Sequence, residues 1–314
     1  MYHSYMKEPI VSVLIPTYNK AEFLGEAIES VLNQTFKDFE LIIVDDCSKD
    51  NTDDVVKRYQ DDCRVKYFKN VKNLGIGGNW NKTLGLATGK YIKFLMGDDK
   101  FEPELLEKYV SVMENNPNVS LVTSYRGVFG DRKSIIKQPL EGLIESKKAI
   151  ELILKHGNWI GEPTTVMFRR ENLWLGNFKV ELKFLLDIDM WVRHLSCGDL
   201  YVIPEVLSWF RQYSGQYTKE VKKHFGDIFE WYYLLEMVFY DRKRYFINEI
   251  KDAEKLKKKS FIKHYKRISS MIKSGNLKLV LECMRIAKKE NIFLPFLIKS
   301  FLYSLKTLWR FNGD

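Results

Sequence analysis

Short apolar runs alternate with helical patterns through the first 115 residues of the chain, and this alternation restricts the fold more than any other sequence feature. Four apolar runs predict buried strands, at residues 11–15, 40–44, 65–68 and 91–95. The segments between and after them have helical spacing, at residues 22–34, 51–59, 79–88 and 104–115. Strands and helices that alternate at this interval are typical of βαβ units. We therefore predict an α/β fold with a mainly parallel sheet and flanking helices.

The rest of the chain changes in character twice. The middle is less regular, with strand patterns at 119–123, 165–168 and 200–203 and a short helix at 189–197. The chain then becomes helical, rich in lysine and aromatic residues. Charge changes at nearly the same place, because residues 1–210 hold 27 Lys and Arg against 30 Asp and Glu, whereas residues 211–314 hold 23 against 11. We predict two parts, an α/β domain over 1–214 and a basic helical extension over 215–314.

Composition excludes several classes of protein. With 45% hydrophobic and 29% charged residues, the chain is neither disordered nor collagen-like. Its four cysteines lie far apart with no C-x-x-C pair, which favours reduced thiols in a reducing compartment. The sequence lacks a secretory leader pattern and an apolar run of about 18 residues, the length that a membrane span needs. We therefore expect a cytoplasmic protein.

Polar side chains follow three of the predicted strands, at the point where each strand ends. They form the stretches Pro16-Thr-Tyr-Asn19, Asp45-Asp46-Cys-Ser48 and Gly97-Asp98-Asp99. Ligands of open α/β sheets bind beyond the carboxyl ends of the strands, so we expect these loops to meet at one crevice. Mg²⁺ or Mn²⁺ on a nucleotide takes one or two carboxylates plus phosphate oxygens, and Asp98 and Asp99 suit that role.

Each acidic pair also has a plainer interpretation. Asp98 and Asp99 could form a solvated turn, and Asp45 and Asp46 could cap the helix that follows them. Other site patterns are absent: the sequence has no G-x-x-x-x-G-K-[ST], and its glycine cluster at residues 75–78 does not match G-x-G-x-x-G. The five histidines have no ligand spacing, so we expect any metal to be held by carboxylates.

Taken in order, the motifs resemble those of the family 2 glycosyltransferases, which are nucleotide-sugar enzymes of the GT-A fold. The resemblance rests first on Val11-Ser-Val-Leu-Ile-Pro-Thr-Tyr-Asn19, Leu41-Ile-Ile-Val-Asp-Asp-Cys-Ser48, Asn73-Leu-Gly75, Ala87-Thr-Gly-Lys-Tyr-Ile92 and Gly97-Asp-Asp99. Three later stretches resemble the acceptor half of that family, at 162–170, 186–193 and 203–211. The resemblance implies a Rossmann-like GT-A domain with a nucleotide-sugar half at about 9–115 and an acceptor half at 116–214.

The resemblance also implies roles for the matching residues. The nucleotide cleft would be formed by Pro16, Thr17, Tyr18, Asn19, Asn73 and Gly75. Asp46, or its neighbour Asp45, would contact the base, usually uracil. Asp98 and Asp99 would bind Mn²⁺ or Mg²⁺ and the donor diphosphate, although Met96 stands where many members have a further Asp.

The catalytic base implied by the resemblance is the Asp of a Glu-Asp pair before a short helix that contains Trp. Asp187 matches this Asp, Leu186 replaces the Glu, and Asp189 is the alternative. Either Asp could instead cap the helix. The implied reaction is a single displacement that inverts the anomeric carbon while the base takes the acceptor proton. Arg169 and Arg170 could approach the diphosphate or an anionic acceptor, or form a solvated pair at a strand end.

The basic extension suggests contact with a membrane surface. A helix after Pro295 would place Lys299, Lys306 and Arg310 on one stripe opposite an apolar face, an arrangement that suits an anionic interface. The same apolar face could instead pack on its own domain. The basic stretch 255–267 has an apolar side as well, so we expect no nucleic-acid partner.

We therefore expect an inverting glycosyltransferase that moves a sugar from a nucleotide sugar, a UDP-sugar in the first place, to a hydroxyl of a glycan or lipid-linked acceptor. We expect it to be peripheral on the cytoplasmic face of the membrane, and no pattern indicates an oligomeric state. A second hypothesis is a catalytically inactive relative that binds sugar nucleotide or membrane, because Met96 and Leu186 replace acids of the family pattern. A nucleotidyltransferase is a further alternative, although it needs a Gly- and Lys/Arg-rich turn after the first strand that this chain lacks.

Overall fold

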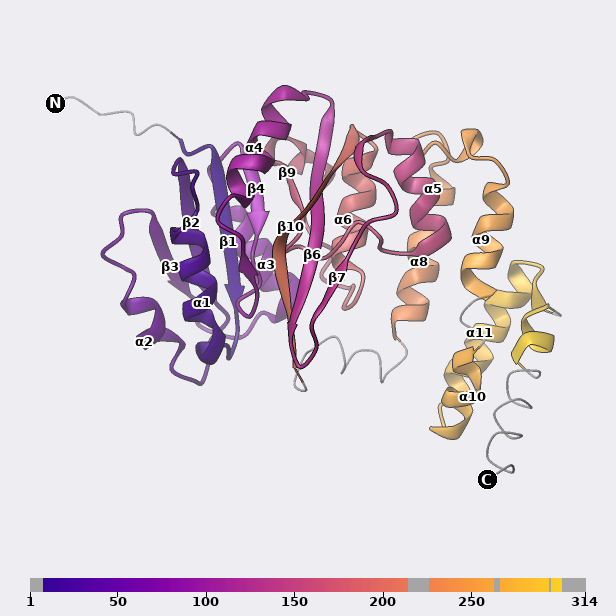
Figure 1. Ribbon diagram of the computed structural model, residues 1–314. Helices are drawn as coiled ribbons and strands as arrows, with labels where there is room; N and C mark the ends of the chain where they lie inside the picture. The colour runs from indigo at the N-terminus through magenta and orange to yellow at the C-terminus, as the bar shows by residue number, and fades with distance from the viewer. Residues whose placement is uncertain (1–7, 214–225, 263–265, 294, 301–314) are drawn as a thin grey trace. The chain divides into compact units, whose positions relative to one another are not determined.

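A computed structural model describes residues 8–213, 226–262, 266–293 and 295–300 (Figure 1). These residues divide into two compact units. One contains residues 8–150 and 158–213, and the other contains residues 151–157 and the described residues from 226 onward. The candidate site lies wholly in the first unit.

One mixed sheet forms the centre of the first unit. Among the described residues it has ten strands, and its main path runs β3-β2-β1-β4-β9-β6-β10-β5. The four strands of the first half are parallel to one another, as predicted: β1 (Val11–Thr17), β2 (Phe39–Asp45), β3 (Val65–Lys69) and β4 (Tyr91–Phe94). Strands β1, β2 and β4 are buried along their whole length, as predicted, whereas β3 lies at the edge of the sheet and is partly exposed.

The second half of the sheet combines parallel and antiparallel pairings, a detail that the predicted α/β fold did not specify. Strand β9 (Met167–Arg169) runs antiparallel to both β4 and β6 (Val119–Gly130), while β6 and β10 (Asp199–Gln212) are parallel. The short strands β5 (Lys100–Phe101), β7 (Ser134–Ile136) and β8 (Gly142–Ile144) add antiparallel pairings. Strands β6 and β10 run well beyond the predicted segments. Their later halves pair with each other, although the sequences there are partly polar.

Helices cover both faces of this sheet (Figure 1). On one face, α1 (Ala21–Leu32), α2 (Thr52–Lys57) and α4 (Leu105–Asn115) pack on alternate strand residues such as Val13 and Ile15. On the other face lie α3 (Gly75–Gly85) and α6 (Leu186–Leu195). There the Trp80 ring lies 6.0 Å from that of Phe94, and the Trp191 ring 5.8 Å from that of Phe168.

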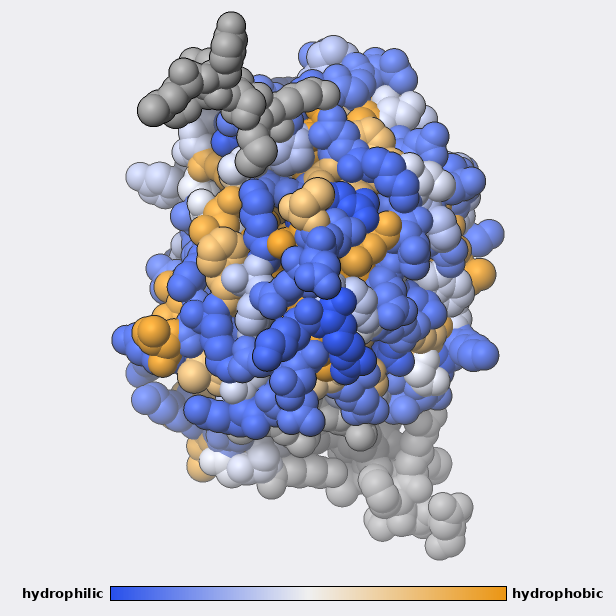
Figure 2. All heavy atoms as spheres, turned by 90° about the vertical axis from the view of Figure 1, so that its left-hand side faces the viewer, coloured by the Kyte–Doolittle hydropathy of each residue, from blue (hydrophilic) through white to orange (hydrophobic). Residues whose placement is uncertain are grey.

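The free edge of the sheet at β3 is polar. Its lysines Lys66 and Lys69 form ion pairs with acids of neighbouring segments. Figure 2, which faces this side, shows a mostly hydrophilic surface broken by small hydrophobic spots. Charged side chains on an edge strand discourage pairing with a second chain.

The remaining segments are mostly helical. They are α5 (Ser146–His156), η1 (Arg170–Leu175), α8 (Gly226–Tyr240), η2 (Ile247–Glu249), α9 (Ala253–Ile262), α10 (Lys266–Lys273) and α11 (Leu277–Lys289). The second unit has its own core, which includes Ile228, Phe261 and Phe296. Residues 295–300 are helical, whereas Lys306 and Arg310 of the expected basic stripe lie outside the described residues. No helix in the described part of the chain has both the length and the apolar character required to cross a bilayer.

Candidate active site

The carboxyl ends of β1, β2 and β4 lie together at one edge of the sheet, as predicted. Thr17 and Asp45 are register partners at the ends of β1 and β2, and the Asp46 backbone N–H donates to the Thr17 carbonyl at 2.9 Å. Beyond β4, Gly97 approaches β1 so closely that a Cβ would lie 3.0 Å from Thr17 Oγ1. Glycine at this position therefore lets the loop that carries Asp98 lie against the end of β1.

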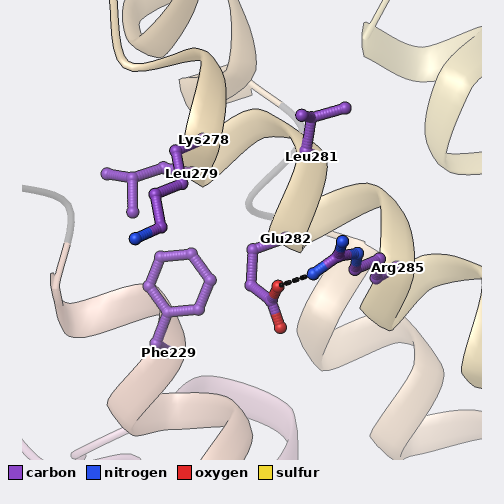
Figure 3. Close-up of a pocket in the computed structure, with 6 residues that line it drawn as sticks. All are labelled: Phe229, Lys278, Leu279, Leu281, Glu282 and Arg285. Atoms are coloured by element: carbon purple, nitrogen blue, oxygen red, sulfur yellow. Dashed lines mark hydrogen bonds and ion pairs between the residues drawn. The ribbon is translucent and has the colours of Figure 1, made fainter.

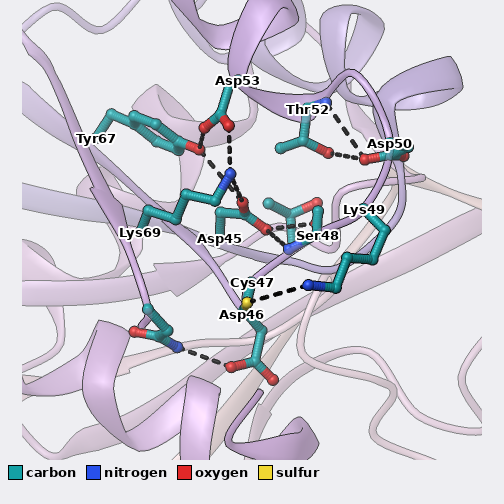
Figure 4. Close-up of polar contacts among 12 residues, drawn as sticks. Asp45, Asp46, Cys47, Ser48, Lys49, Asp50, Thr52, Asp53, Tyr67 and Lys69 are labelled. Atoms are coloured by element: carbon teal, nitrogen blue, oxygen red, sulfur yellow. Dashed lines mark hydrogen bonds and ion pairs between the residues drawn. The ribbon is translucent and has the colours of Figure 1, made fainter. Parts of the chain in front are cut away.

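Asp45 is fully buried and organises the loop after β2 (Figure 4). Its Oδ1 accepts hydrogen bonds from the Ser48 backbone N–H at 3.0 Å and from the Ser48 hydroxyl, and Lys69 Nζ lies 3.6 Å from Oδ2. The Ser48 hydroxyl in turn accepts from the Asn19 N–H at 2.8 Å. Asn19 has a φ of 51°, which is uncommon outside glycine. Asp45 thus fixes the loop after β1 through Ser48.

Asp46 connects the same loop to the start of α3. Its carboxylate accepts hydrogen bonds from the N–H groups of Leu74 and Gly75 at 2.8 and 2.9 Å and from Asn70 Nδ2 at 2.8 Å. Asn73 Nδ2 donates to the Asp46 carbonyl at 3.2 Å. The first N–H groups of a helix lack partners within it. Asp46 therefore does cap a helix, but that helix is α3 rather than α2, which follows it directly.

The predicted stretch 16–19 is divided between strand and crevice. Pro16 and Thr17 belong to β1 and are buried, whereas Tyr18 is 44% exposed. Thr17 Oγ1 is buried and has no hydrogen-bond partner among the described residues. Most buried polar groups are paired, so this hydroxyl is a candidate for a bond to a ligand.

Asp98 lies in the loop after β4, with a side chain that is 13% exposed. Its Oδ2 accepts hydrogen bonds from Lys20 Nζ at 2.9 Å and from the Tyr213 hydroxyl at 2.8 Å, and its carbonyl accepts one from Arg211 Nε at 2.8 Å. Within the described residues no hydrogen bond reaches Asp98 Oδ1. This oxygen fits as one ligand of a divalent ion whose other ligands are phosphate oxygens and water.

Asp99 is placed differently from its neighbour. It is 1% exposed, its Oδ2 accepts a hydrogen bond from Thr164 Oγ1 at 2.5 Å, and its Oδ1 accepts one from the Arg211 N–H at 2.9 Å. Burial, and then the charge of Asp98, raise the pKa of Asp99 well above its usual range. Both Asp99 oxygens therefore accept hydrogen bonds within the protein, and Asp98 is the more exposed of the two acids. Among the described residues no three His, Cys, Asp or Glu side chains gather as a metal site.

The segment 158–166 links this edge to the expected catalytic base. At one end Asn158 Nδ2 donates to Asp187 Oδ2 at 2.9 Å, and at the other Thr164 binds Asp99. Between them, the Gly161 carbonyl accepts from Trp191 Nε1 at 2.9 Å. The fully buried Lys93 of β4 donates to the Thr164 carbonyl. Asp187 and the Asp98 loop are thereby held by one segment.

Asp187 is half-buried in the first turn of α6. Burial raises its pKa to about 7, and the nearby Glu162 raises it as well, although a hydrogen bond from the Ile188 N–H, at 2.7 Å from Oδ1, acts in the opposite direction. A carboxyl group that titrates near neutral pH is suited to general base catalysis.

Asp189 is not brought to the crevice. Helix α6 begins at Leu186, so Asp189 lies within the helix and does not cap it. It is fully buried, with Lys179 Nζ 2.9 Å from Oδ1 and Arg193 Nη2 2.8 Å from Oδ2. Each of its two carboxylate oxygens thus forms an ion pair.

The expectation that Arg169 or Arg170 approaches the diphosphate is wrong. Arg169 is the register partner of Tyr91, at the amino end of β4, because β9 runs antiparallel to that strand. Its Nε donates to the Val119 carbonyl at 2.7 Å, and Arg170 Nε donates to the Gly89 carbonyl at 2.8 Å. Both side chains thus lie at the opposite edge of the sheet from Asp98.

Five residues of the site were not predicted from the sequence: Lys20, Asn158, Thr164, Arg211 and Tyr213. Three of them had a signal, since Lys20 directly follows the stretch 16–19, Thr164 lies in the stretch 162–170 and Arg211 ends the stretch 203–211. The other two, Asn158 and Tyr213, become recognisable only through their contacts with the predicted acids.

Two hollows among the described residues are lined by residues outside the loops after β1, β2 and β4. One, of about 420 Å³, lies in the second unit between Phe229 of α8 and side chains of α11 (Figure 3). The other, of about 430 Å³, lies beside Lys90 and Arg170. The candidate site is therefore defined by its converging loops.

Comparisons with known proteins agree with these motifs. The model of the family described as Glycosyl transferase family 2 matches residues 12–175. An uncharacterized glycosyltransferase of Methanocaldococcus jannaschii is 31% identical over 78% of this chain and 84% of its own length. TuaG of Bacillus subtilis, which is named as a teichuronic acid biosynthesis glycosyltransferase, is 31% identical over 65% of this chain and 79% of its own length.

Solved structures share the fold. TarS residues 1–349 of S. aureus in complex with UDP-GlcNAc align with a TM-score of 0.63 at 19% identity, over 94% of this chain and 92% of that one. A longer TarS structure aligns with a TM-score of 0.62 and 19% identity over 81% of this chain, which spans only 43% of its length. The mannosyltransferase PcManGT of Pyrobaculum calidifontis, in complex with GDP-Man and Mn²⁺, aligns with a TM-score of 0.57 at 14% identity, over 94% of this chain and 88% of that one.

Proposed function

Because the chain belongs to glycosyltransferase family 2, and so is a nucleotide-sugar-dependent glycosyltransferase of the GT-A fold, we propose that it transfers a sugar from a UDP-sugar to a hydroxyl of a glycan or lipid-linked saccharide. The transfer inverts the anomeric carbon. The observation that carries this proposal is the half-buried Asp187 carboxyl group, with a pKa of about 7, on a segment that also holds the Asp98 loop.

In the proposed reaction Asp187 is the catalytic base. It takes the proton from the acceptor hydroxyl as the acceptor oxygen bonds to the anomeric carbon. The bond between that carbon and the diphosphate oxygen breaks, and the nucleoside diphosphate leaves. The step needs no covalent intermediate, and the proton stays on Asp187 until solvent removes it.

The donor would bind along the ends of β1, β2 and β4. Tyr18 and the loop held by Asp46, Asn73 and Gly75 would contact the nucleoside. Asp98 Oδ1 would be a ligand for Mn²⁺ or Mg²⁺, and Asp99 would position its neighbour. A divalent ion, when bound there, would stabilise the charge of the departing diphosphate. The TarS complex with UDP-GlcNAc supports a uridine donor, and the PcManGT complex supports a metal.

The acceptor proposal has its own support. TuaG is named for the biosynthesis of teichuronic acid. We therefore favour a saccharide of a cell-surface polymer as acceptor, with the basic second unit near an anionic membrane surface that carries lipid-linked chains.

A thermal-shift titration against UDP-, GDP- and dTDP-sugars tests the donor site. Ligands that bind the native state raise the midpoint by mass action, so one UDP-sugar should raise it more than the others do, and more with Mn²⁺ than with chelator. A chain that responds to no nucleotide sugar in either condition would contradict the donor site.

The substitution Asp187→Asn tests the base. We expect kcat to fall by about 10²–10⁴-fold, because Asn cannot take a proton, while the Kd of the donor stays the same. Asp189→Asn is the contrast: it should lower the free energy of unfolding by about 3–5 kcal/mol, because it breaks a buried ion-pair cluster. A folded Asp189→Asn protein with intact stability and the larger loss of kcat would instead make Asp189 the base.

A further inference from the structure

A lysine ammonium group lies beside Asp98, at the edge where the three loops meet. Lys20 occupies the N-cap position of α1, and its Nζ lies 2.9 Å from Asp98 Oδ2. The ion pair is largely shielded from solvent, since the two side chains are 25% and 13% exposed. The Tyr213 hydroxyl donates to the same carboxylate oxygen at 2.8 Å, and the Tyr213 ring centroid lies 4.7 Å from Lys20 Nζ. The ammonium group is therefore held in place.

Only one of the two neighbouring carboxylates, Asp98 and Asp99, is accessible at this edge. Asp99 is buried, with both oxygens hydrogen-bonded within the protein, so Asp98 is the acid that faces the crevice. The Lys20 ammonium group accompanies it, whereas Arg211, whose Nε donates to the Asp98 carbonyl at 2.8 Å, is itself ion-paired with Glu26. A diphosphate that enters here would meet the Lys20 ammonium group, which the chain itself supplies.

We propose that Lys20 binds the donor diphosphate directly, so that the protein holds a nucleoside diphosphate without a divalent ion. The ammonium group has three donors, two of which bind Asp98 and the Tyr213 hydroxyl, and the third is available to a phosphate oxygen. Tyr213 is a positioning residue that keeps the ammonium group at the end of β1. Asp98 Oδ1 still fits a divalent ion, which would strengthen binding at a site that already functions. This inference rests on the donor site of the proposed function.

The first test is calorimetric titration of the full chain with UDP in excess EDTA, repeated with Mn²⁺. We expect the parent protein to bind UDP in EDTA and Lys20→Met to weaken that binding at least about tenfold, since it removes a charge-assisted hydrogen bond. Lys20→Arg should keep the affinity within about threefold of the parent, because the charge remains. Uridine, which has no phosphate, should bind the parent and Lys20→Met equally.

The matched control is Lys90→Met. Lys90 is also an ion-paired lysine, 2.8 Å from Glu114, but it lies at the opposite, amino end of β4. Its loss should leave the UDP affinity unchanged. If Lys20→Met has a lower thermal midpoint than the parent, Lys20→Gln, which keeps a polar group beside Asp98, takes its place in the same titrations.

A second variant distinguishes binding through Lys20 from binding through a divalent ion. In a site that depends on metal alone, Asp98→Asn would abolish UDP binding. If Lys20 holds the diphosphate, Asp98→Asn removes the competing carboxylate, and UDP should bind in EDTA at least as tightly as to the parent while the gain on adding Mn²⁺ disappears.

Two results would overturn the inference and leave the proposed function intact: UDP binding by the parent only when Mn²⁺ is present, or equal UDP affinity of Lys20→Met and parent in EDTA. If neither UDP nor GDP binds the parent in either condition, the donor site itself is wrong, and the proposed function fails with it.

Discussion

The four acids of the candidate site are all aspartates, and they differ in how deeply the fold buries them. Asp189 is fully buried between two cations and Asp99 is buried among hydrogen-bond donors, so the carboxylate oxygens of both are engaged within the protein. Asp98 and Asp187 keep an exposed part and a partner that orients them. We therefore expect these two to act on a ligand.

The pH dependence of activity follows from Asp187. A base must be ionised, and its pKa in the protein is about 7, so kcat/KM should rise about tenfold per pH unit below pH 7 and level off above it. Asn158 donates to the ionised carboxylate, so Asn158→Ala should move the rising limb to higher pH. Initial rates between pH 5.5 and 9 measure both effects. If the residual activity of Asp187→Asn shows the same rise of kcat/KM with pH, the rise must come from a group other than Asp187.

At the scale of elements, the start of α3 depends on an acid from another strand. Asp46 of the β2 loop accepts from the first N–H groups of this helix, and Gly75 has the positive φ of 74° that the junction requires. The loop after β2 and the helix after β3 are therefore a single structural piece, and the expected nucleoside contacts depend on its integrity.

Asp46→Asn should destabilise the protein in the absence of ligand. The substitution removes a charge and one of the acceptors at the helix N-terminus, which costs about 1–2 kcal/mol of unfolding free energy. Urea unfolding measures it. Asp54→Asn, in the exposed first turn of α2, is the control and should stay within about 0.5 kcal/mol of the parent. Equal stabilities of the two variants would refute the capping role.

At the scale of the whole molecule, each of the two units has a hydrophobic cluster of its own among the described residues. The core of the sheet unit includes Ile28, and that of the helical unit includes Ile286. Part of the basic charge of the helical unit is used internally, since Lys257 Nζ lies 2.7 Å from Glu236 and 3.1 Å from Glu290. Not all of its lysines are therefore available to an anionic surface.

Calorimetry of the full chain should resolve two unfolding transitions, because each unit has its own core. UDP should raise the midpoint of one of them, the transition of the sheet unit. Ile28→Ala should lower the midpoint of the same transition, and Ile286→Ala should lower that of the other. Each substitution should cost its unit about 2–5 kcal/mol of unfolding free energy. A single transition that both substitutions lower alike would show that the units unfold together.

The sequence by itself determined the first half of the fold and the position of its ligand edge. Strands β1 to β4 are rich in apolar residues, and the carboxyl ends of parallel strands must meet at one edge, so the sequence alone predicts that Thr17, Asp45 and Asp98 lie close together. The motifs at 16–19, 45–48 and 97–99 lie in this half, where the carboxyl ends of the strands carry them.

Only the tertiary structure decided which acids are exposed and which cations accompany them. Strand β9 runs antiparallel, which carries Arg169 away from the site, and the ends of β10 and α1 bring Tyr213 and Lys20 to Asp98. Residues separated by 193 positions cannot be paired from local patterns, because periodicity records which face of an element is buried but not what packs against it. Burial and charge at Asp98, Asp99, Asp187 and Asp189 are properties of that packing.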